Sequence, residues 1–514
     1  MSKSVTWTHL FLLSFLTASA QSIKVNGVIQ HFTNSSDSIE LNMPLTGEYY
    51  RSNSVFSRIT QRGEFEFRLS AKGPVYVQLI YEKKKHWLLV SPGRDLFVLI
   101  DTSNQKDMFA FSGAAKTEND LLANLEPNGG LFFSQRNAKG RVQGPYLSWA
   151  EDSILQILLP RVKIDLEKDE EIILESGIPG KIKNCLQIDL KYYYANEFIT
   201  LAGTWASKNG IRRYLRLAES ITKTFGLPLE HELEVSNAAN RWLQLLAEAE
   251  VEIANFKYSY ISDKQKADSI FRSQFGVSYE YFWDTVKSKF GNNAAFDLEG
   301  LRLLSGYAAE RWLAARIEVE CEVSDLKEAE SLLKTWSDHY PSSELRSACA
   351  AKIRSLDESR SKFLSDLDIH IRPDYRQISN LRELLAPYKG KVVYIDLWGT
   401  WCAPCAKEMK FEPQLRDKFQ NGDVTFLFVD NDADQFDEKW RTYIQVNDLK
   451  GEHVRLTGEQ LRRIWEELAP PYHRDSYPTY FIVDRHGNLS VKIAKRPSDQ
   501  NALYEQISEV LAKK

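Results

Sequence analysis

The run WGTWCAPCAKE, Trp398 to Glu408, places two cysteines, Cys402 and Cys405, three positions apart. Such a pair can exchange disulfides, supply half of a zinc site or form a small structural disulfide. A zinc site needs two more ligands, and no His pair follows at ligand spacing. The other cysteines lie far upstream, at Cys185, Cys321 and Cys349. A disulfide across so small a loop removes little entropy from the unfolded chain. The pair therefore indicates thiol-disulfide exchange and no metal.

A strand and a helix must position this pair. The apolar run VVYIDLW, residues 392–398, predicts a buried strand, and the two cysteines open the helix that follows. The unsatisfied N–H groups and the positive dipole end of a helix N-terminus stabilise a thiolate. We therefore expect Cys402, at the exposed end of the helix, to attack a disulfide. Cys405, one turn inward, would then resolve the mixed disulfide.

Residues from about 365 to 514 alternate strands and helices in the order β-α-β…β-β-α, with the run GKVVYIDLWGTWCAPCAKE at the Cys pair. This pattern resembles the thioredoxin fold in its extracytoplasmic TlpA/ResA-type branch. The resemblance implies that Asp396 is the buried acid that relays the proton of Cys405, and that Glu408 lines the cavity. Two simpler interpretations stay open. Asp396 could cap local backbone at a strand end, and Glu408 could compensate the helix dipole.

The same resemblance implies a substrate surface beside the sulfurs. Tyr477-Pro478 matches the cis-proline position, where the backbone of the preceding residue pairs with an extended substrate segment. Tyr477 is bulkier than the usual residue there. Trp401 would add a flat apolar rim around Cys402. For Trp398, filling of the core is the favoured interpretation.

The bulk composition bounds the organisation. At 514 residues the chain is long enough for two to four domains. A net charge of -4 gives no basic field for nucleic acid or an anionic membrane. We predict a multidomain α/β protein with a β-rich, sandwich-like domain over 21–115, a helical domain over 116–364 and a thioredoxin-like domain over 365–514. Short β-branched runs indicate the first, and amphipathic periodicity indicates the second.

The N-terminus is typical of an export signal. Lys3 precedes the apolar run LFLLSFL, and ASA, residues 18–20, has the small-x-small pattern of a cleavage site. A buried helix is the alternative. We expect residues 1–20 to be removed, which leaves a chain without direct membrane insertion in the periplasm or cell envelope.

These features together predict an exported thiol-disulfide oxidoreductase that reduces disulfides of client proteins. It needs no cofactor, and the resemblance implies a membrane electron donor. An oxidase or isomerase on the same scaffold is one alternative. An envelope binding or scaffolding protein with an auxiliary thioredoxin-like domain is another. The three upstream cysteines are expected to be buried, and a Cys321–Cys349 bridge stays open.

Overall fold

The computed structural model describes residues 21–32, 38–82, 84–104, 108–125, 145–209, 214–259, 263–281, 304–339, 343–363, 368–419, 422–468 and 477–513. The expected signal peptide, residues 1–20, lies outside this set. The chain divides into two compact units, residues 1–316 with 336–346 and residues 317–335 with 347–514. This division differs from the three-domain organisation, which therefore stays a prediction. Among the described residues, no helix has both the length and the hydrophobicity that crossing a membrane requires.

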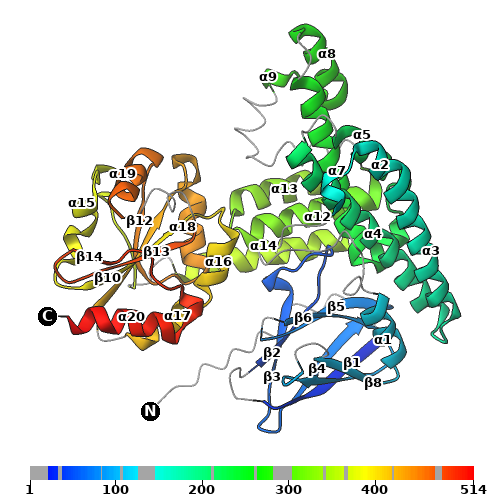
Figure 1. Cartoon of the computed structure of the whole chain (residues 1–514), viewed down its shortest axis with the longest axis horizontal. Helices are drawn as coiled ribbons and strands as arrows, with labels where there is room; N and C mark the ends of the chain where they lie inside the picture. The colour runs from blue at the N-terminus through cyan, green and yellow to red at the C-terminus, as the bar shows by residue number, and fades with distance from the viewer. Residues whose placement is uncertain are drawn as a thin grey trace. The chain divides into compact units, whose positions relative to one another are not determined.

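The first unit contains two four-stranded sheets (Figure 1). One has the order β4-β1-β7-β8 and the other β3-β2-β5-β6. Every second residue of β4 is buried, as expected for a strand with one face on a core. Buried residues of both sheets form one hydrophobic cluster, as in a β-sandwich. The strands are β1 (Gln21–Gln30), β2 (Ser38–Asn42), β3 (Ser54–Arg58), β4 (Glu64–Ala71), β5 (Val75–Tyr81), β6 (Lys84–Val90), β7 (Leu96–Asp101) and β8 (Phe109–Gly113).

Helices make up the rest of the first unit. Fully buried aromatic side chains, such as Tyr192, Trp205 and Trp242, fill their shared core. The described helices are α1 (Lys116–Leu125), α2 (Glu151–Ser153), α3 (Leu159–Glu175), α4 (Gly180–Asn209), α5 (Tyr214–Phe225), α6 (Glu230–Val235), α7 (Asn237–Ser259), α8 (Lys264–Phe275) and α9 (Tyr279–Tyr281). Three further helices contribute to both units: α12 (Gly306–Glu322), α13 (Leu326–His339) and α14 (Glu344–Phe363).

The second unit is built on a six-stranded sheet with the order β14-β13-β10-β11-β12-β9. Strands β10, β11, β12 and β9 are parallel, while β13 runs antiparallel to both β10 and β14. Its strands are β9 (Ile369–Ile371), β10 (Val392–Trp398), β11 (Val424–Asp430), β12 (Gly451–Arg455), β13 (Thr479–Val483) and β14 (Leu489–Val491). Its helices are α15 (Leu381–Leu385), α16 (Ala403–Met409), α17 (Glu412–Lys418), α18 (Asp437–Val446), α19 (Gly458–Leu468) and α20 (Asn501–Ala512).

Helices cover both faces of this sheet (Figure 1). Tyr394 and Trp398 of β10 share a hydrophobic cluster with residues of α16, α17, α18 and α20. The alternate residues Ile395 and Leu397 share a second cluster with α15 and α19. Because successive side chains of a strand point to opposite faces, Asp396 lies on the same face as Tyr394 and Trp398. The fold therefore places this acid on the face that the Cys-bearing helix covers.

Candidate active site

The two cysteines meet at the start of α16. Cys402 and Cys405 form a disulfide with an S–S distance of 2.00 Å and a Cα–Cα distance of 5.2 Å. Cys402 is the N-cap residue, and its sulfur accepts a hydrogen bond from the backbone N–H of Cys405 at 3.2 Å. Pro404 lies in the first helical turn, where its missing N–H costs nothing. The expectation that the Cys pair opens a helix is confirmed.

The sulfurs are less exposed than expected. Cys402 is 4% exposed and Cys405 1%, within the same hydrophobic cluster as Trp398 and Met409. In the disulfide form both residues are covered, Cys402 slightly less than Cys405, and the order of attack stays a prediction. The apolar surroundings explain the difference, because they close over a pair that carries no charge.

The expected rim lies beside the pair. Trp401 is 56% exposed, and its ring meets that of Tyr477 edge-on at 5.2 Å. The Tyr477-Pro478 bond is cis, as expected. The Tyr477 hydroxyl accepts a hydrogen bond from Asn431 at 3.0 Å and a longer one from Trp465 at 3.4 Å, which fix its ring. Trp398, by contrast, is fully buried, so the core interpretation is the right one for it.

Asp396 lies on the sheet face that α16, the helix with the Cys pair, covers. It is 2% exposed, and its direct cross-strand neighbour is Tyr480 of β13. Neither carboxyl oxygen has a hydrogen-bond partner among the described residues. The interpretation as a local backbone cap therefore finds no hydrogen bond in its favour. Burial raises the pKa of Asp396 well above its usual value, and the charges of Glu412 and Glu408 raise this pKa further.

Glu408 is held by a residue from the far end of the chain. Its carboxylate accepts hydrogen bonds from the backbone N–H and the hydroxyl of Ser498, both at 3.0 Å. Arg496 adds a longer ion pair at 3.9 Å. These contacts tie α16 to the turn Pro497–Asp499 before α20. The carboxylate thus has a structural task that neither sequence interpretation included.

Glu412 is a site residue that the sequence analysis missed. It opens α17, is 1% exposed, and neither of its carboxyl oxygens has a hydrogen-bond partner within the described part of the chain. Burial raises its pKa to about 8, although Arg416 lowers it and Glu408 raises it. Its spacing of four residues from Glu408 and seven from Cys405 was the available signal, because such positions share a helix face.

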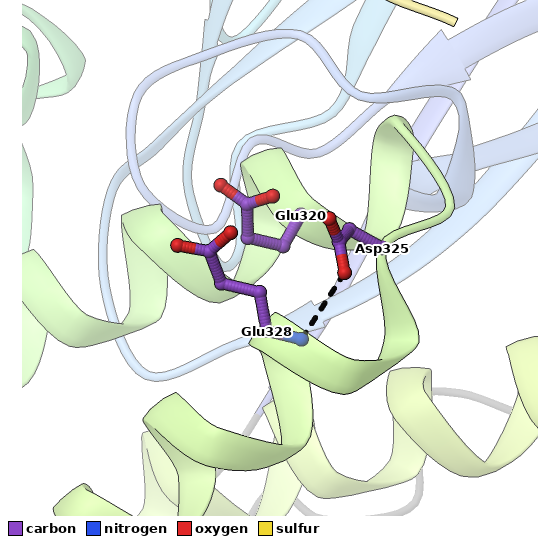
Figure 2. A group of neighbouring side chains, drawn as sticks. All are labelled: Glu320, Asp325 and Glu328. Atoms are coloured by element: carbon purple, nitrogen blue, oxygen red, sulfur yellow. Dashed lines mark hydrogen bonds between the residues drawn. The ribbon is translucent and has the colours of Figure 1, made fainter. Parts of the chain in front are cut away.

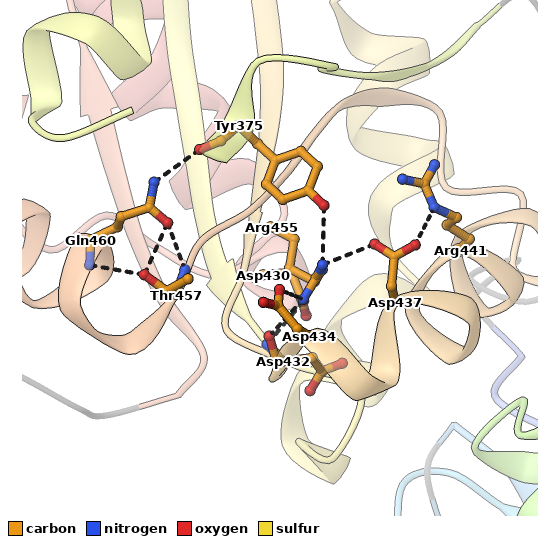
Figure 3. A network of polar contacts seen from close by, with 9 residues as sticks. All are labelled: Tyr375, Asp430, Asp432, Asp434, Asp437, Arg441, Arg455, Thr457 and Gln460. Atoms are coloured by element: carbon orange, nitrogen blue, oxygen red, sulfur yellow. Dashed lines mark hydrogen bonds and ion pairs between the residues drawn. The ribbon is translucent and has the colours of Figure 1, made fainter. Parts of the chain in front are cut away.

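A polar network lies at the carboxyl ends of β11 and β12 (Figure 3). It reaches the loop before Cys402, because the backbone N–H of Thr400 donates to Asp432 at 3.2 Å. Burial raises the pKa of both Asp430 and Asp432. Arg455, only 2% exposed, forms ion pairs with Asp434 and Asp437. It also donates a hydrogen bond to the Tyr375 hydroxyl. The network joins the carboxyl ends of β11 and β12 to the active-site loop.

A second acidic group lies between α12 and α13 (Figure 2). One carboxylate oxygen from each of Glu320, Asp325 and Glu328 lies within 4.8 Å of the other two. Asp325 accepts a hydrogen bond from the backbone N–H of Glu328 at 3.2 Å, as a cap at the start of α13 does. Lys439 lies 3.7 Å from Asp325 and supplies positive charge to the group. These contacts describe a helix start, and we assign no ligand to it.

The other three cysteines, Cys185, Cys321 and Cys349, form no disulfide. Cys185 and Cys349 are buried and Cys321 is half-buried, so the possible Cys321–Cys349 bridge is not formed. Burial raises the pKa of Cys185 and of Cys321 to about 12. Neither is therefore poised to act as a thiolate at neutral pH.

The C-terminal part of the chain is similar to known proteins. The Redoxin family model matches residues 372–507. The C-terminal part of the chain is a redoxin domain. Thiol-disulfide oxidoreductase ResA of Bacillus thuringiensis is 30% identical over 129 residues, which is 25% of this chain and 66% of that protein. Thioredoxin-like protein YneN of Bacillus subtilis is 27% identical over 117 residues, 22% of this chain and 64% of that protein. The chain thus spans just under two thirds of the length of these relatives.

Two solved structures are similar to the same domain. A protein of Bacteroides vulgatus described as a thiol-disulfide oxidoreductase is 30% identical, with a TM-score of 0.21, over 25% of this chain and 78% of that one. A thiol:disulfide interchange protein DsbE from Chlorobium tepidum is 26% identical, with a TM-score of 0.21, over 25% of this chain and 85% of that one. The resemblance of the redoxin domain to the thioredoxin-like, TlpA/ResA-type proteins is confirmed by the family model and the ResA relatives.

Proposed function

We propose that this protein is an exported thiol-disulfide oxidoreductase that reduces disulfides of client proteins in the periplasm or cell envelope. The strongest support is the position of the Cys402 sulfur. The Cys402 sulfur caps α16 and accepts the N–H of Cys405, so a thiolate formed there faces the positive end of a helix.

The reaction is a two-step exchange. The Cys402 thiolate attacks one sulfur of a client disulfide, and the other client sulfur leaves as a thiolate that takes a proton from water. Cys405 then loses its proton and attacks the Cys402 sulfur, which releases the second client thiolate and closes the Cys402–Cys405 disulfide. Two electrons pass from the Cys pair to the client. A dithiol donor at the membrane would restore the reduced pair, and no cofactor takes part.

The rim supports a protein substrate. Trp401 offers exposed apolar surface, and the resemblance implies that the backbone beside the cis Pro478 pairs with an extended client segment. The names of the relatives, thiol-disulfide oxidoreductases among them, point the same way. Export is supported by the signal-like sequence of residues 1–20.

Paired cysteine variants test the proposal. Cys405→Ser should accumulate mixed disulfides with client proteins, because the resolving sulfur is missing. Dithiothreitol should reduce these mixed disulfides and release the clients. Cys402→Ser should form none, and Cys321→Ala, a thiol outside the site, should behave as the wild type. If cells that carry Cys402→Ser behave as cells with the wild-type protein do, the binding or scaffolding role would be supported instead. A reduction potential well below that of an oxidant, which is about -120 mV, would favour the reductase direction.

A further inference from the structure

Three side chains of the redoxin domain carry buried oxygen atoms that lack hydrogen-bond partners among the described residues. The five atoms are both carboxyl oxygens of Asp396, both of Glu412 and the hydroxyl of Tyr480. All three side chains are at most 2% exposed. Most buried polar atoms in proteins are hydrogen-bonded, and exceptions need an explanation such as a catalytic role.

Three elements bring these side chains together. Asp396 on β10 is the direct cross-strand neighbour of Tyr480 on β13, and the Tyr480 ring stacks on Tyr394 at 5.4 Å. Glu412 is the first residue of α17, and Leu415 of this helix belongs to the same hydrophobic cluster as Tyr394, Tyr480 and both cysteines. Its charge acts on Asp396, Tyr394 and Tyr480 and raises the pKa of each. The two carboxyl groups therefore belong to one electrostatic site.

The charges around this site do not neutralise two carboxylates. Glu408 from α16 adds negative charge, and Tyr394, Tyr480 and Tyr504 are uncharged phenols that face it from β10, β13 and α20. The nearby cations are engaged elsewhere. Arg416 donates to the Lys450 carbonyl at 3.0 Å, and Arg496, whose side chain is 54% exposed, lies against Glu408. Among the described residues, neither Asp396 nor Glu412 has an ion pair.

Two buried carboxyl groups without a cation cannot both ionise easily, since each negative charge opposes the other. We infer that Asp396 and Glu412 share one proton and act together, in place of Asp396 alone, as the base for Cys405. This inference rests on the proposed function. Glu412 then has a role in the resolving step that Glu408, held by Ser498, does not have.

Above about pH 8, where Glu412 with its raised pKa ionises, the pair holds one proton and has one free base site. In the resolving step the Cys405 thiol gives its proton to that site, and the Cys405 sulfur bonds to the Cys402 sulfur. The bond between Cys402 and the client sulfur breaks, and the client leaves as a thiolate. The pair is then fully protonated, and it returns this proton to Cys405 when a dithiol donor reduces the disulfide. Protons and electrons balance over the cycle.

The first measurement does not depend on catalysis. The infrared band of the protonated Asp396 carboxyl, assigned by its loss in Asp396→Asn, is titrated in the full-length oxidised protein. In Glu412→Gln the Asp396 pKa should fall, because the neighbouring charge is gone. Glu509→Gln removes the same charge from an exposed position of α20 and should leave it unchanged. If the Asp396 pKa is the same in Glu412→Gln and in the wild type, the two carboxyl groups do not share a proton.

The second measurement is the rate of the resolving step at pH 8.5. Asp396→Asn and Glu412→Gln should each slow it less than about tenfold, since the other carboxyl remains. The double variant should slow it by about 100-fold or more, the usual contribution of a general base. Glu412→Asp should restore most of the rate, which a purely structural role would not predict. If the resolving step is no slower in the double variant than in Asp396→Asn, Glu412 has no role as a base. If the wild type exchanges no disulfide, the proposed function fails, and the infrared titration still decides whether the proton is shared.

Discussion

The backbone N–H of Thr400 donates a hydrogen bond to Asp432 Oδ2, 3.2 Å away, and this contact ties the active-site loop to the end of β11. Both residues are buried, at 7% and 3% exposure. Asp432 in turn donates its own N–H to Asp430 at 3.0 Å. The loop that carries Trp401 and Cys402 is thus anchored from a neighbouring strand as well as by its own helix.

Asp432→Ala should loosen this loop. A buried N–H that loses its acceptor costs about 1–3 kcal/mol, so amide hydrogen exchange at Thr400 should become about 5- to 150-fold faster. Asp432→Asn keeps an acceptor oxygen and is the matched control, with a much smaller change. Equal exchange at Thr400 in both variants would show that the hydrogen bond does not anchor the loop.

Two tryptophans of the motif should respond in opposite ways. Trp398 is fully buried, so Trp398→Ala should cost about 3–5 kcal/mol of stability. Trp401 is 56% exposed, and Trp401→Ala should cost less than about 1 kcal/mol. Trp401→Ala should instead slow exchange with a protein disulfide more than with a small aliphatic disulfide, because under the proposed function the Trp401 ring contacts the client protein. Thermal unfolding and exchange rates measure the two effects. A large loss of stability in Trp401→Ala would contradict the rim assignment.

Gly399 sets the position of the Trp401 ring. A Cβ atom at Gly399 would lie 2.5 Å from Trp401 Nε1, closer than real contacts allow. Gly399→Ala should therefore displace the indole, change its fluorescence and slow client exchange towards the rate of Trp401→Ala. Gly458→Ala, where a Cβ would meet nothing within 4 Å, is the control. If Gly399 acts through the ring, adding Gly399→Ala to Trp401→Ala should bring no further loss.

Local sequence predicted the parts of the site that depend on local structure. The Cys pair at a helix start follows from a strand, a short loop and Pro404, all within about fifteen residues. The cis Pro478 was predicted by family resemblance, and the buried Asp396 lies on a strand whose residues are all buried. Each of these needs little knowledge of distant residues.

The partners of the acids could not be predicted in the same way. Glu408 is bound by Ser498, 90 residues away in the sequence. Glu412 is 1% exposed, and its charge acts on Tyr480 and Tyr504, which lie far from it in the sequence. Four residues separate Glu408 at the end of α16 from Glu412 at the start of α17, and only the tertiary packing distinguishes the hydrogen-bonded carboxylate from the buried one.

A buried histidine gives the redoxin domain a defined acid sensitivity. His453 on β12 is fully buried and stacks on Phe428 at 4.8 Å, and its Nε2 lies 2.6 Å from the Leu449 carbonyl oxygen. Burial lowers its pKa from 6.5 to about 3. The neutral imidazole therefore contributes stability that is complete above pH 6.5 and is lost as the pH falls towards 3, because the unfolded chain takes up the proton first.

His453→Gln should remove this part of the pH dependence. Between pH 7 and pH 4 the wild type should lose about 3 kcal/mol through this group, and the variant should lose correspondingly less, although its stability at pH 7 is lower. Calorimetric unfolding of the full chain at both pH values measures the difference. His486→Gln, which removes an exposed imidazole, should keep the wild-type dependence. If His453→Gln loses as much stability on acidification as the wild type, the imidazole is not the group that the acid titrates.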